Sequence, residues 1–283
     1  VDAIDDPFFA ALVSAVEDGA IGLGLDVVGA ATRFDPARER AQLLRLAGQR
    51  PRGIILAPTG DAYDFLQPYR ATTPIVTVDR LVNGFDSITV DDEAGARRAV
   101  EHLIVGGHRR IALIGYDPRF GTSRRRREGY EAVLRRHGID VPAEFCPEVP
   151  FASASARDAV HAVLALPEPP SALFLANARH ATTVVSALHE IARTDLAVVS
   201  FGDFTLADAV RPAISCIDQD PRLMGTLAFE RLIELSEHSD QEPEHHVMPT
   251  TFVTRSSHDI PAHVAGSLRS AVEHPSRDSA AAQ

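Results

Sequence analysis

Charged side chains stand where two apolar runs of this 283-residue chain end, and they could bind a small polar molecule. The β-branched run Pro74–Val78 is followed by Asp79 and Arg80, and the run Ile88–Val90 is followed by Asp91. A carboxylate accepts hydrogen bonds and a guanidinium donates them in pairs, so such residues suit a ligand with hydroxyl groups. Ligands of parallel α/β sheets bind beside the carboxyl ends of the strands. Asp79 is therefore a candidate binding residue.

The segments around these side chains alternate between strands and amphipathic helices. Apolar residues recur at helical spacing from Ala96 to Ile104, Gly106 ends this helix, and a strand begins at Ile111. Strands are also expected at Leu25–Val28, Ile54–Leu56, Phe145–Val149, Ala172–Ala176, Ala197–Phe201, Ile214–Ile217 and Val247–Thr254. Helices are expected from Pro7 and over about Pro36–Ala47, Arg126–Leu134, Ser153–Leu166, Thr182–Ala192 and Leu223–Leu235. This alternation predicts an α/β fold of parallel sheets covered by helices on both faces. Two comparable series, about 1–90 and 91–217, predict two similar doubly wound lobes with a ligand cleft between them.

The composition excludes several classes of protein. A net charge of −11 gives the chain as a whole no electrostatic footprint for nucleic acid or for an anionic membrane. Every basic residue is arginine, so no lysine is available for a Schiff base or a Walker phosphate loop. Cys146 and Cys216 lie far apart and indicate neither a disulfide framework nor a zinc site. The sequence also contains no apolar run long enough to span a membrane.

Motifs of common enzymes are incomplete in this chain. His189-Glu190 begins a zinc-protease motif, but Arg193 stands where the second histidine is required. A dinucleotide fingerprint that starts at Gly22 lacks its last glycine, because residue 27 is valine. We therefore predict a protein that is not an enzyme and that needs no cofactor and no metal ion.

Three segments resemble the ligand-binding core of the lactose- and galactose-repressor (LacI/GalR) family of transcription factors. They are PIVTVDR at 74–80, ITVDDEAGARRAVEHLI at 88–104 and GGHRRIALIG at 106–115, and the resemblance extends over about Val1 to Ser257. It implies a periplasmic-binding-protein-like fold in which the chain crosses between the lobes near Val90, Asp218 and His245. The first lobe would then comprise 1–90 plus 219–244, and the second 91–217 plus 246–259.

The two ends of the chain are also interpreted from this resemblance and from composition. The start, VDAIDDPFF, resembles the end of the family's first strand, so most of that strand and the DNA-binding domain before it are expected to lie outside this chain. The tail 260–283 is rich in Ala, Ser, His and Pro without periodicity, and we expect it to be disordered.

The resemblance also places polar ligand-binding residues at strand and helix ends. Arg126, three residues before Gly129-Tyr130, resembles an arginine that reaches into the family's cleft, although a structural salt bridge is the alternative. A guanidinium there could bind two vicinal hydroxyls or a carboxylate. Asn177 follows the strand ALFLA, and Gln219 in CIDQDP matches a cleft-lining glutamine at the crossover between lobes.

Aromatic residues are further candidates. Phe8 and Phe9 follow the first strand, and we expect one of them in the core while the other stacks on a ligand ring. Phe151 resembles an aromatic residue of the family's pocket, with a core position as an equal alternative.

Two positions depart from the family's pattern. Ala178 and Gly202 stand where aspartate is usual, which leaves Asp203 as the carboxylate of the second position. Because that aspartate commonly holds the effector in the family, the resemblance does not imply which ligand this chain binds.

The predicted function is the effector-binding and dimerisation part of a LacI-type regulator in the cytoplasm. A cleft of Asp, Arg, Asn and Gln side chains with aromatic faces suits a sugar or sugar derivative, and a purine is the alternative. The expected partners are this small effector, a second copy of the chain, and operator DNA through an N-terminal module outside this chain, with no membrane. A periplasmic-type sugar receptor of a transport system is the first alternative function, and an enzyme acting in the same cleft is the second.

Overall fold

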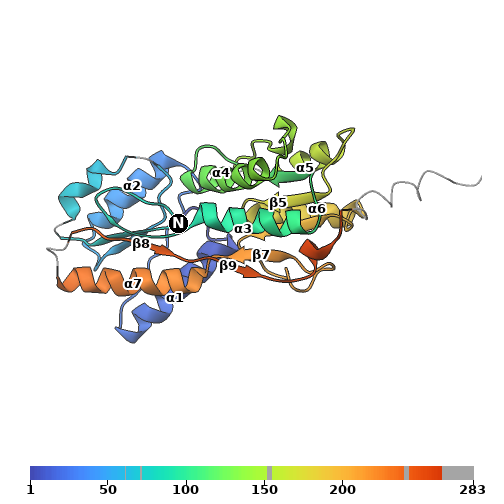
Figure 1. Cartoon of the computed structure of the whole chain (residues 1–283). Helices are drawn as coiled ribbons and strands as arrows, with labels where there is room; N and C mark the ends of the chain where they lie inside the picture. Colours follow the sequence, from blue (N-terminus) through green and yellow to red (C-terminus); the bar gives the residue numbers. More distant parts are fainter. Residues whose placement is uncertain (61, 71, 152–154, 239–241, 263–283) are drawn as a thin grey trace, which may run out of the picture.

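The computed structural model describes residues 1–60, 62–70, 72–151, 155–238 and 242–262, which form two α/β lobes that lie side by side (Figure 1). The helices are α1 (Pro7–Gly22), α2 (Pro36–Ala47), α3 (Asp92–Val105), α4 (Gly121–Arg136), α5 (Ala156–Leu164), α6 (Ala178–Glu190) and α7 (Pro221–Glu237), with short 3-10 helices η1 (Asp64–Tyr69), η2 (Ala143–Phe145) and η3 (Ser257–Asp259). The strands are β1 (Ile54–Leu56), β2 (Ile75–Val78), β3 (Asp86–Val90), β4 (Ile111–Ile114), β5 (Ala172–Leu175), β6 (Ala197–Phe201), β7 (Ser215–Asp218), β8 (His245–Met248) and β9 (Thr251–Val253).

Each lobe is built on its own sheet. The first lobe has a four-stranded sheet in the order β1-β2-β3-β8, all parallel. The second lobe has a five-stranded sheet in the order β4-β5-β6-β7-β9, in which β9 pairs antiparallel with β7 and the other pairs are parallel. In Figure 1, α7 in orange lies with the blue elements of the first lobe, and it packs closely against α1. The predicted fold of two parallel-sheet lobes is confirmed.

Aspartates cap the starts of α1, α2 and α3. Asp6 and Asp35 each precede a proline, and their side chains accept hydrogen bonds from backbone N–H groups of the first turn of α1 and α2. A proline in the first turn fits because it has no N–H group to leave unpaired there. Asp91 caps α3 in the same way, through the Ala94 N–H at 2.9 Å. Because α3 starts directly after β3, this cap places carboxylates at the carboxyl end of the sheet.

Two glycines allow helices to pack closely. A Cβ atom on Gly225 of α7 would collide with the carbonyl oxygen of Leu12 in α1. A Cβ atom on Gly129 of α4 would lie 2.5 Å from the carbonyl oxygen of Glu93 in α3. The second contact matters for the candidate site, because it brings Arg126 of α4 next to α3.

The expected strand Leu25–Val28 does not form. None of the described strands pairs with this segment, and Val28 in it is 69% exposed. An apolar hollow of about 340 Å³ is lined by this segment, by β1 and by parts of α1 and α2. Apolar β-branched residues alone are thus insufficient, because a strand also needs a neighbour for its backbone hydrogen bonds.

Two further expectations about strands are corrected. The segment expected as a strand at 145–149 forms the end of η2 and a single parallel bridge between Tyr116 and Glu148. The run expected as one strand at 247–254 divides: β8 pairs with β3 in the first lobe, and β9 pairs with β7 in the second. The chain therefore leaves the first sheet after Met248, later than the expected crossing near His245.

Of the expected disordered tail, residues 263–283 lie outside the described part of the chain. The carbonyl oxygen of Ile260 lies 2.7 Å from Nε2 of His108, so the described start of this segment contacts the second lobe. No helix among the described residues is long and apolar enough to cross a membrane.

Candidate ligand site between the lobes

An aromatic cluster lies where the two lobes meet. Phe34 of the first lobe packs against Phe120 and Phe151 of the second, with ring centroids 6.0 and 5.5 Å apart, and the latter two rings are 5.1 Å apart. All three side chains are buried together with Ala3. Phe34 has a φ of 60°, a left-handed conformation that is uncommon for a bulky residue and that tends to occur at functional sites. These three rings therefore form a contact between the lobes, and a ligand that entered between the lobes could contact the same rings.

Arg80 connects this cluster to the carboxylates of the first lobe. Its guanidinium donates to Asp2 at 2.7 Å and to the carbonyl oxygen of Pro58 at 2.6 Å, and it lies 3.2 Å from Asp79. The same guanidinium lies over the ring of Phe120, 4.6 Å from its centroid. Arg80 thus binds acids of its own lobe and an aromatic face of the other lobe. Its Nε atom is buried without a hydrogen-bond partner among the described residues.

A second contact between the lobes is the ion pair of Arg179 and Asp5, at 3.2 Å. Next to it, Asp6 is almost completely buried, and burial raises the pKa of its carboxyl group from 3.8 to about 6. The nearby carboxylates of Asp79 and Asp2 raise this pKa further, whereas the Phe8 N–H and Arg179 oppose the shift. The inner face of the first lobe therefore carries several acidic groups close together.

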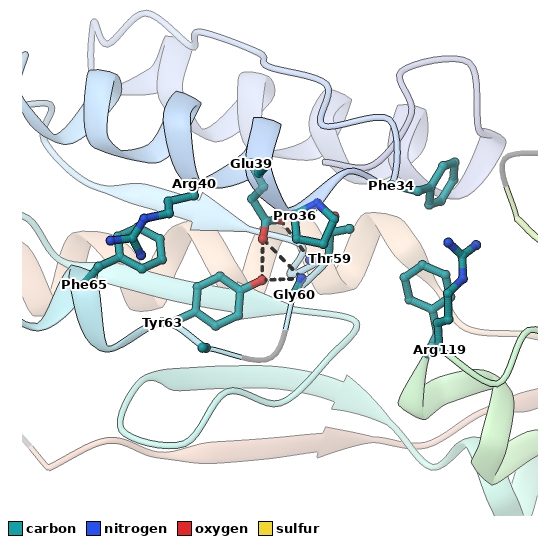
Figure 2. A pocket seen from close by; sticks show the side chains of 12 residues that line it. Phe34, Pro36, Glu39, Arg40, Thr59, Gly60, Tyr63, Phe65 and Arg119 are labelled. Atoms are coloured by element: carbon teal, nitrogen blue, oxygen red, sulfur yellow. Dashed lines mark hydrogen bonds between the residues drawn. The ribbon is translucent and has the colours of Figure 1, made fainter.

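A hollow of about 600 Å³ opens beside the aromatic cluster and has the size of a small-molecule pocket. Figure 2 shows Tyr63 and Glu39 pointing toward one another and toward Gly60, with Arg40 beside the ring of Phe65. The Tyr63 hydroxyl donates to Glu39, and the Arg40 guanidinium lies 4.0 Å from the ring centroid of Phe65. On the opposite side of Figure 2, the hollow is bounded by Phe34 and by Arg119 of the second lobe.

A second hollow, of about 370 Å³, contains three of the residues expected from the sequence. Phe8, Asp203 and Gln219 all line it. Asp203 is bound by Arg255 through two hydrogen bonds of 2.9 and 2.5 Å, so its carboxylate is already engaged. Gln219 is buried, and its Nε2 atom has no hydrogen-bond partner among the described residues.

Of the pair Phe8 and Phe9, the structure places Phe9 in the hydrophobic core of the first lobe, where it is 4% exposed. Phe8 is the member that faces a hollow. Phe9 is therefore removed from the candidate ligand residues, and Phe8 is retained.

Arg126 forms a buried ion pair at the start of the second lobe. Its Nε donates to Asp92 at 2.8 Å, its Nη1 donates to the carbonyl oxygen of Ala176 at 2.8 Å, and it lies over the ring of Phe201. The structural salt bridge that was the alternative for Arg126 is thus present. No described residue accepts a hydrogen bond from Nη2, which leaves one nitrogen atom for a ligand.

Asn177 is the N-cap residue of α6, which is a structural role. Its Oδ1 accepts from the His180 N–H at 2.8 Å, and its Nδ2 lies 3.3 Å from the carbonyl oxygen of Gly115 and 3.0 Å from Nδ1 of His180. Burial, followed by the charge of Arg179, lowers the pKa of the His180 ring to about 4. The ring is therefore neutral at pH 7, and Nδ1 accepts the hydrogen bond from Asn177.

Several residues of this region were missed by the sequence interpretation. Phe34 and Phe120 carried no periodic signal, since each lies in a turn before a helix. Arg80 was noted at the end of a strand, but its neighbour Asp79 was chosen as the candidate binding residue. The acid at position 2 is the buried partner of Arg80, a contact between residues 78 positions apart that no local pattern reveals.

Two sheets with parallel strands, joined by crossovers and with hollows between them, define a two-lobed ligand-binding protein. Residues 100–258 match the family model described as a periplasmic binding protein-like domain. The ribose operon repressor of Escherichia coli is 30% identical over 241 residues, which cover 82% of this chain and 73% of the repressor.

Solved structures agree with this match. A LacI family transcriptional regulator from Mycobacterium smegmatis is 26% identical, with a TM-score of 0.76 over 92% of this chain and 97% of that protein. The complex of the transcriptional regulator CelR with cellobiose is 25% identical, with a TM-score of 0.75 over 89% of this chain and 79% of that protein. The chain belongs to the LacI family of transcriptional regulators and comprises its periplasmic-binding-protein-like, effector-binding domain.

Proposed function

We propose that this domain binds a small polyhydroxylated effector, a sugar or sugar derivative, between its lobes and thereby regulates DNA binding. The observation that carries the proposal is the contact of Arg80 with Asp2 in one lobe and with Phe120 in the other. A ligand that replaces these contacts binds both lobes, so it favours one relative arrangement of them. Two relatives support a sugar: the E. coli protein is named for the ribose operon, and CelR is complexed with cellobiose.

We also propose the binding partners that are typical of regulators of this family. The domain would act as a homodimer, and operator DNA would be bound by an N-terminal module outside this chain, in the cytoplasm. In a two-fold dimer, a shift of the lobes changes the spacing of the attached DNA-binding modules. The chain by itself should not bind operator DNA, because its net charge is −11. Salt-sensitive, sequence-specific binding in a gel-shift assay with the 283-residue chain would contradict this proposal.

Within this site we propose roles for residues from both lobes. Asp79 and Phe8 would contact the ligand from the first lobe, by accepting hydrogen bonds from hydroxyl groups and by covering its C–H face. Arg126 would donate through Nη2 from the second lobe. Phe151 would present its ring once Phe34 moves away. Catalysis is not part of this proposal, which concerns binding alone.

The remaining candidates would act at the second hollow and at the start of α6. Gln219 would donate through its unpaired amide. Asn177 would support ligand binding indirectly, because its hydrogen bond with the His180 N–H fixes the start of α6. Asp203 would contribute only if a ligand shares it with Arg255.

Arg126→Ala tests the site. We expect the affinity for the effector to fall at least tenfold, or about 1.4 kcal/mol, measured by calorimetry with D-ribose and cellobiose as the first probes. Arg126→Lys keeps the charge opposite Asp92 but loses the planar fork, so it should also weaken binding while it preserves more stability. Arg124→Ala, on the exposed side of the same helix turn, is the control and should leave affinity unchanged. An unchanged affinity in folded Arg126→Ala protein would remove this residue from the site.

A further inference from the structure

The turn at residues 32–35 has a backbone conformation that its sequence disfavours. The Asp35 N–H donates to the carbonyl oxygen of Thr32 at 3.3 Å, which closes a β-turn. The two central residues, Arg33 and Phe34, have φ angles of 57° and 60°. A turn with positive φ at both central positions usually contains glycine, asparagine or aspartate, because the Cβ atom of other residues is crowded there. Contacts outside the turn must therefore hold it in this conformation.

The second residue of the chain holds the base of this turn. The Arg33 N–H donates to the carbonyl oxygen of Asp2 at 2.8 Å. The carboxylate of Asp2, which is fully buried, accepts from the Thr32 hydroxyl at 3.2 Å and from the Arg80 guanidinium at 2.7 Å. One buried acid of the first lobe therefore positions both the turn and Arg80, and each of them contacts an aromatic ring of the second lobe.

The tip of the turn places the Phe34 ring against the second lobe. The ring centroid lies 6.0 Å from that of Phe120 and 5.5 Å from that of Phe151, and Phe34 is only 9% exposed. The Arg179 guanidinium lies 5.9 Å from the same centroid. All three partners belong to the second lobe, whereas the turn itself is bound to the first. Burial and aromatic packing of the ring offset the cost of the left-handed backbone.

The Phe34 ring occupies aromatic faces that an effector could use. Phe34 and Phe120 also line the 600 Å³ hollow beside the cluster (Figure 2). A sugar that entered from this hollow and stacked on Phe120 or Phe151 would need the place of the Phe34 ring. Because the backbone of the turn is unfavourable, loss of the ring's contacts should allow the turn to change conformation. The ring is therefore suited to exchange with a ligand.

We propose that Phe34 is a latch between the lobes: its ring holds them together in the protein without effector, and the effector displaces it from Phe120 and Phe151. The effector then binds only those molecules in which the ring has left these faces, so the latch lowers the apparent affinity. Phe34 thereby sets the effector concentration at which the domain responds. The inference rests on the proposed function for the identity of the competing ligand, whereas the contact between the lobes can be tested without any ligand.

Phe34→Ala and Phe34→Gly test the latch. Both remove the ring, and glycine also fits the left-handed backbone, so the pair separates the effect of the ring from that of the turn. Arg33→Gly is the matched control, because it relieves the neighbouring left-handed residue, whose side chain is exposed, and keeps the ring. Phe34 lies in a separate cluster outside the hydrophobic cores of the two lobes, so the variants should fold.

The distance between the lobes is measured by electron–electron double resonance in the absence of ligand. Spin labels are attached to Arg45→Cys in α2 and Arg135→Cys in α4, two exposed positions, in a Cys146→Ser background. Cys216 is completely buried and should not react. We expect a narrow distribution of distances in the unmodified protein and in Arg33→Gly, and a broader one that includes longer distances in both Phe34 variants. Unchanged distributions in Phe34 variants that urea unfolding shows to be folded would overturn the latch.

Calorimetry with D-ribose and cellobiose tests the competition. A probe that binds the unmodified protein should bind Phe34→Gly at least about threefold more tightly, because the ring no longer competes. Equal or weaker binding by Phe34→Gly would show that the ring does not compete with the effector, and it would overturn the proposal. If neither sugar binds any of these proteins, the proposed function fails for these probes, and the distance measurement still decides whether the latch exists.

Discussion

Replacement of Asp6 by asparagine should stabilise the protein, and the gain should increase with pH. The folded state raises the pKa of this carboxyl group from 3.8 to about 6, mainly by burial. Each pKa unit corresponds to about 1.4 kcal/mol, so the ionised carboxylate destabilises the fold by about 3 kcal/mol. Asparagine is also a good N-cap, so the hydrogen bond from the Phe8 N–H at 3.0 Å can be kept.

The direction of the pH effect follows from the raised pKa. The folded protein holds the proton of Asp6 more tightly than the unfolded chain does. Stability contributed by this group is therefore complete below pH 3.8 and is lost as the pH rises to about 6. Asparagine does not titrate, so Asp6→Asn should be more stable than the unmodified protein by about 1.5 kcal/mol at pH 5 and by about 3 kcal/mol at pH 8.

Urea unfolding at pH 5 and pH 8 measures this difference. Asp35→Asn is a matched control, because Asp35 also caps a helix in front of a proline but is exposed to solvent. Its effect should be small and equal at both pH values. If Asp6→Asn were destabilising at pH 8, or if its effect did not change with pH, the argument that Asp6 is a buried acid would be refuted.

Further predictions concern the packing that supports the site. Gly225→Ala should destabilise the protein by about 1–3 kcal/mol in urea unfolding, because the added methyl group would collide with the carbonyl oxygen of Leu12. Gly22→Ala in α1 is the control: its methyl group would meet no atom within 4 Å, so the substitution should be neutral or slightly stabilising. Phe9→Ala should cost about 3–5 kcal/mol by the same measurement, since Phe9 is buried in the core. Phe8→Ala should cost less and should instead weaken effector binding; a larger loss of stability from Phe8 than from Phe9 would reverse their assignment.

Elements with a strong local signal were predicted correctly. Helix α2 begins and ends at the residues expected, because Asp35-Pro36 is a start signal and the apolar spacing continues to Ala47. Strands β4 and β6 also have the expected bounds, since short apolar runs flanked by polar residues become the buried strands of a parallel sheet. These patterns depend on neighbours within a few positions of each other.

The candidate site was predicted only in part. The sequence placed Asp79, Asn177 and Gln219 at strand or helix ends, as the structure does. Arg126 was expected at the start of its helix, but α4 begins earlier, at Gly121. The sequence could not show that Arg126 binds Asp92, or that Asp203 is held by Arg255. These pairs join residues 34 and 52 positions apart, and such contacts depend on how the elements pack.

The sequence by itself determined the alternation of strands and helices, the caps that start the helices, and the absence of lysine chemistry, because each is a property of local order or of composition. The tertiary structure alone decided three other matters. It placed Phe9 inside and Phe8 at a hollow, although the two are adjacent. It divided the run 247–254 between two sheets, since backbone pairing with β3 and β7 outweighs the continuity of the apolar pattern. It also brought Ala178 and Gly202 together, because close packing of the second sheet against α6 joins positions that no sequence periodicity relates.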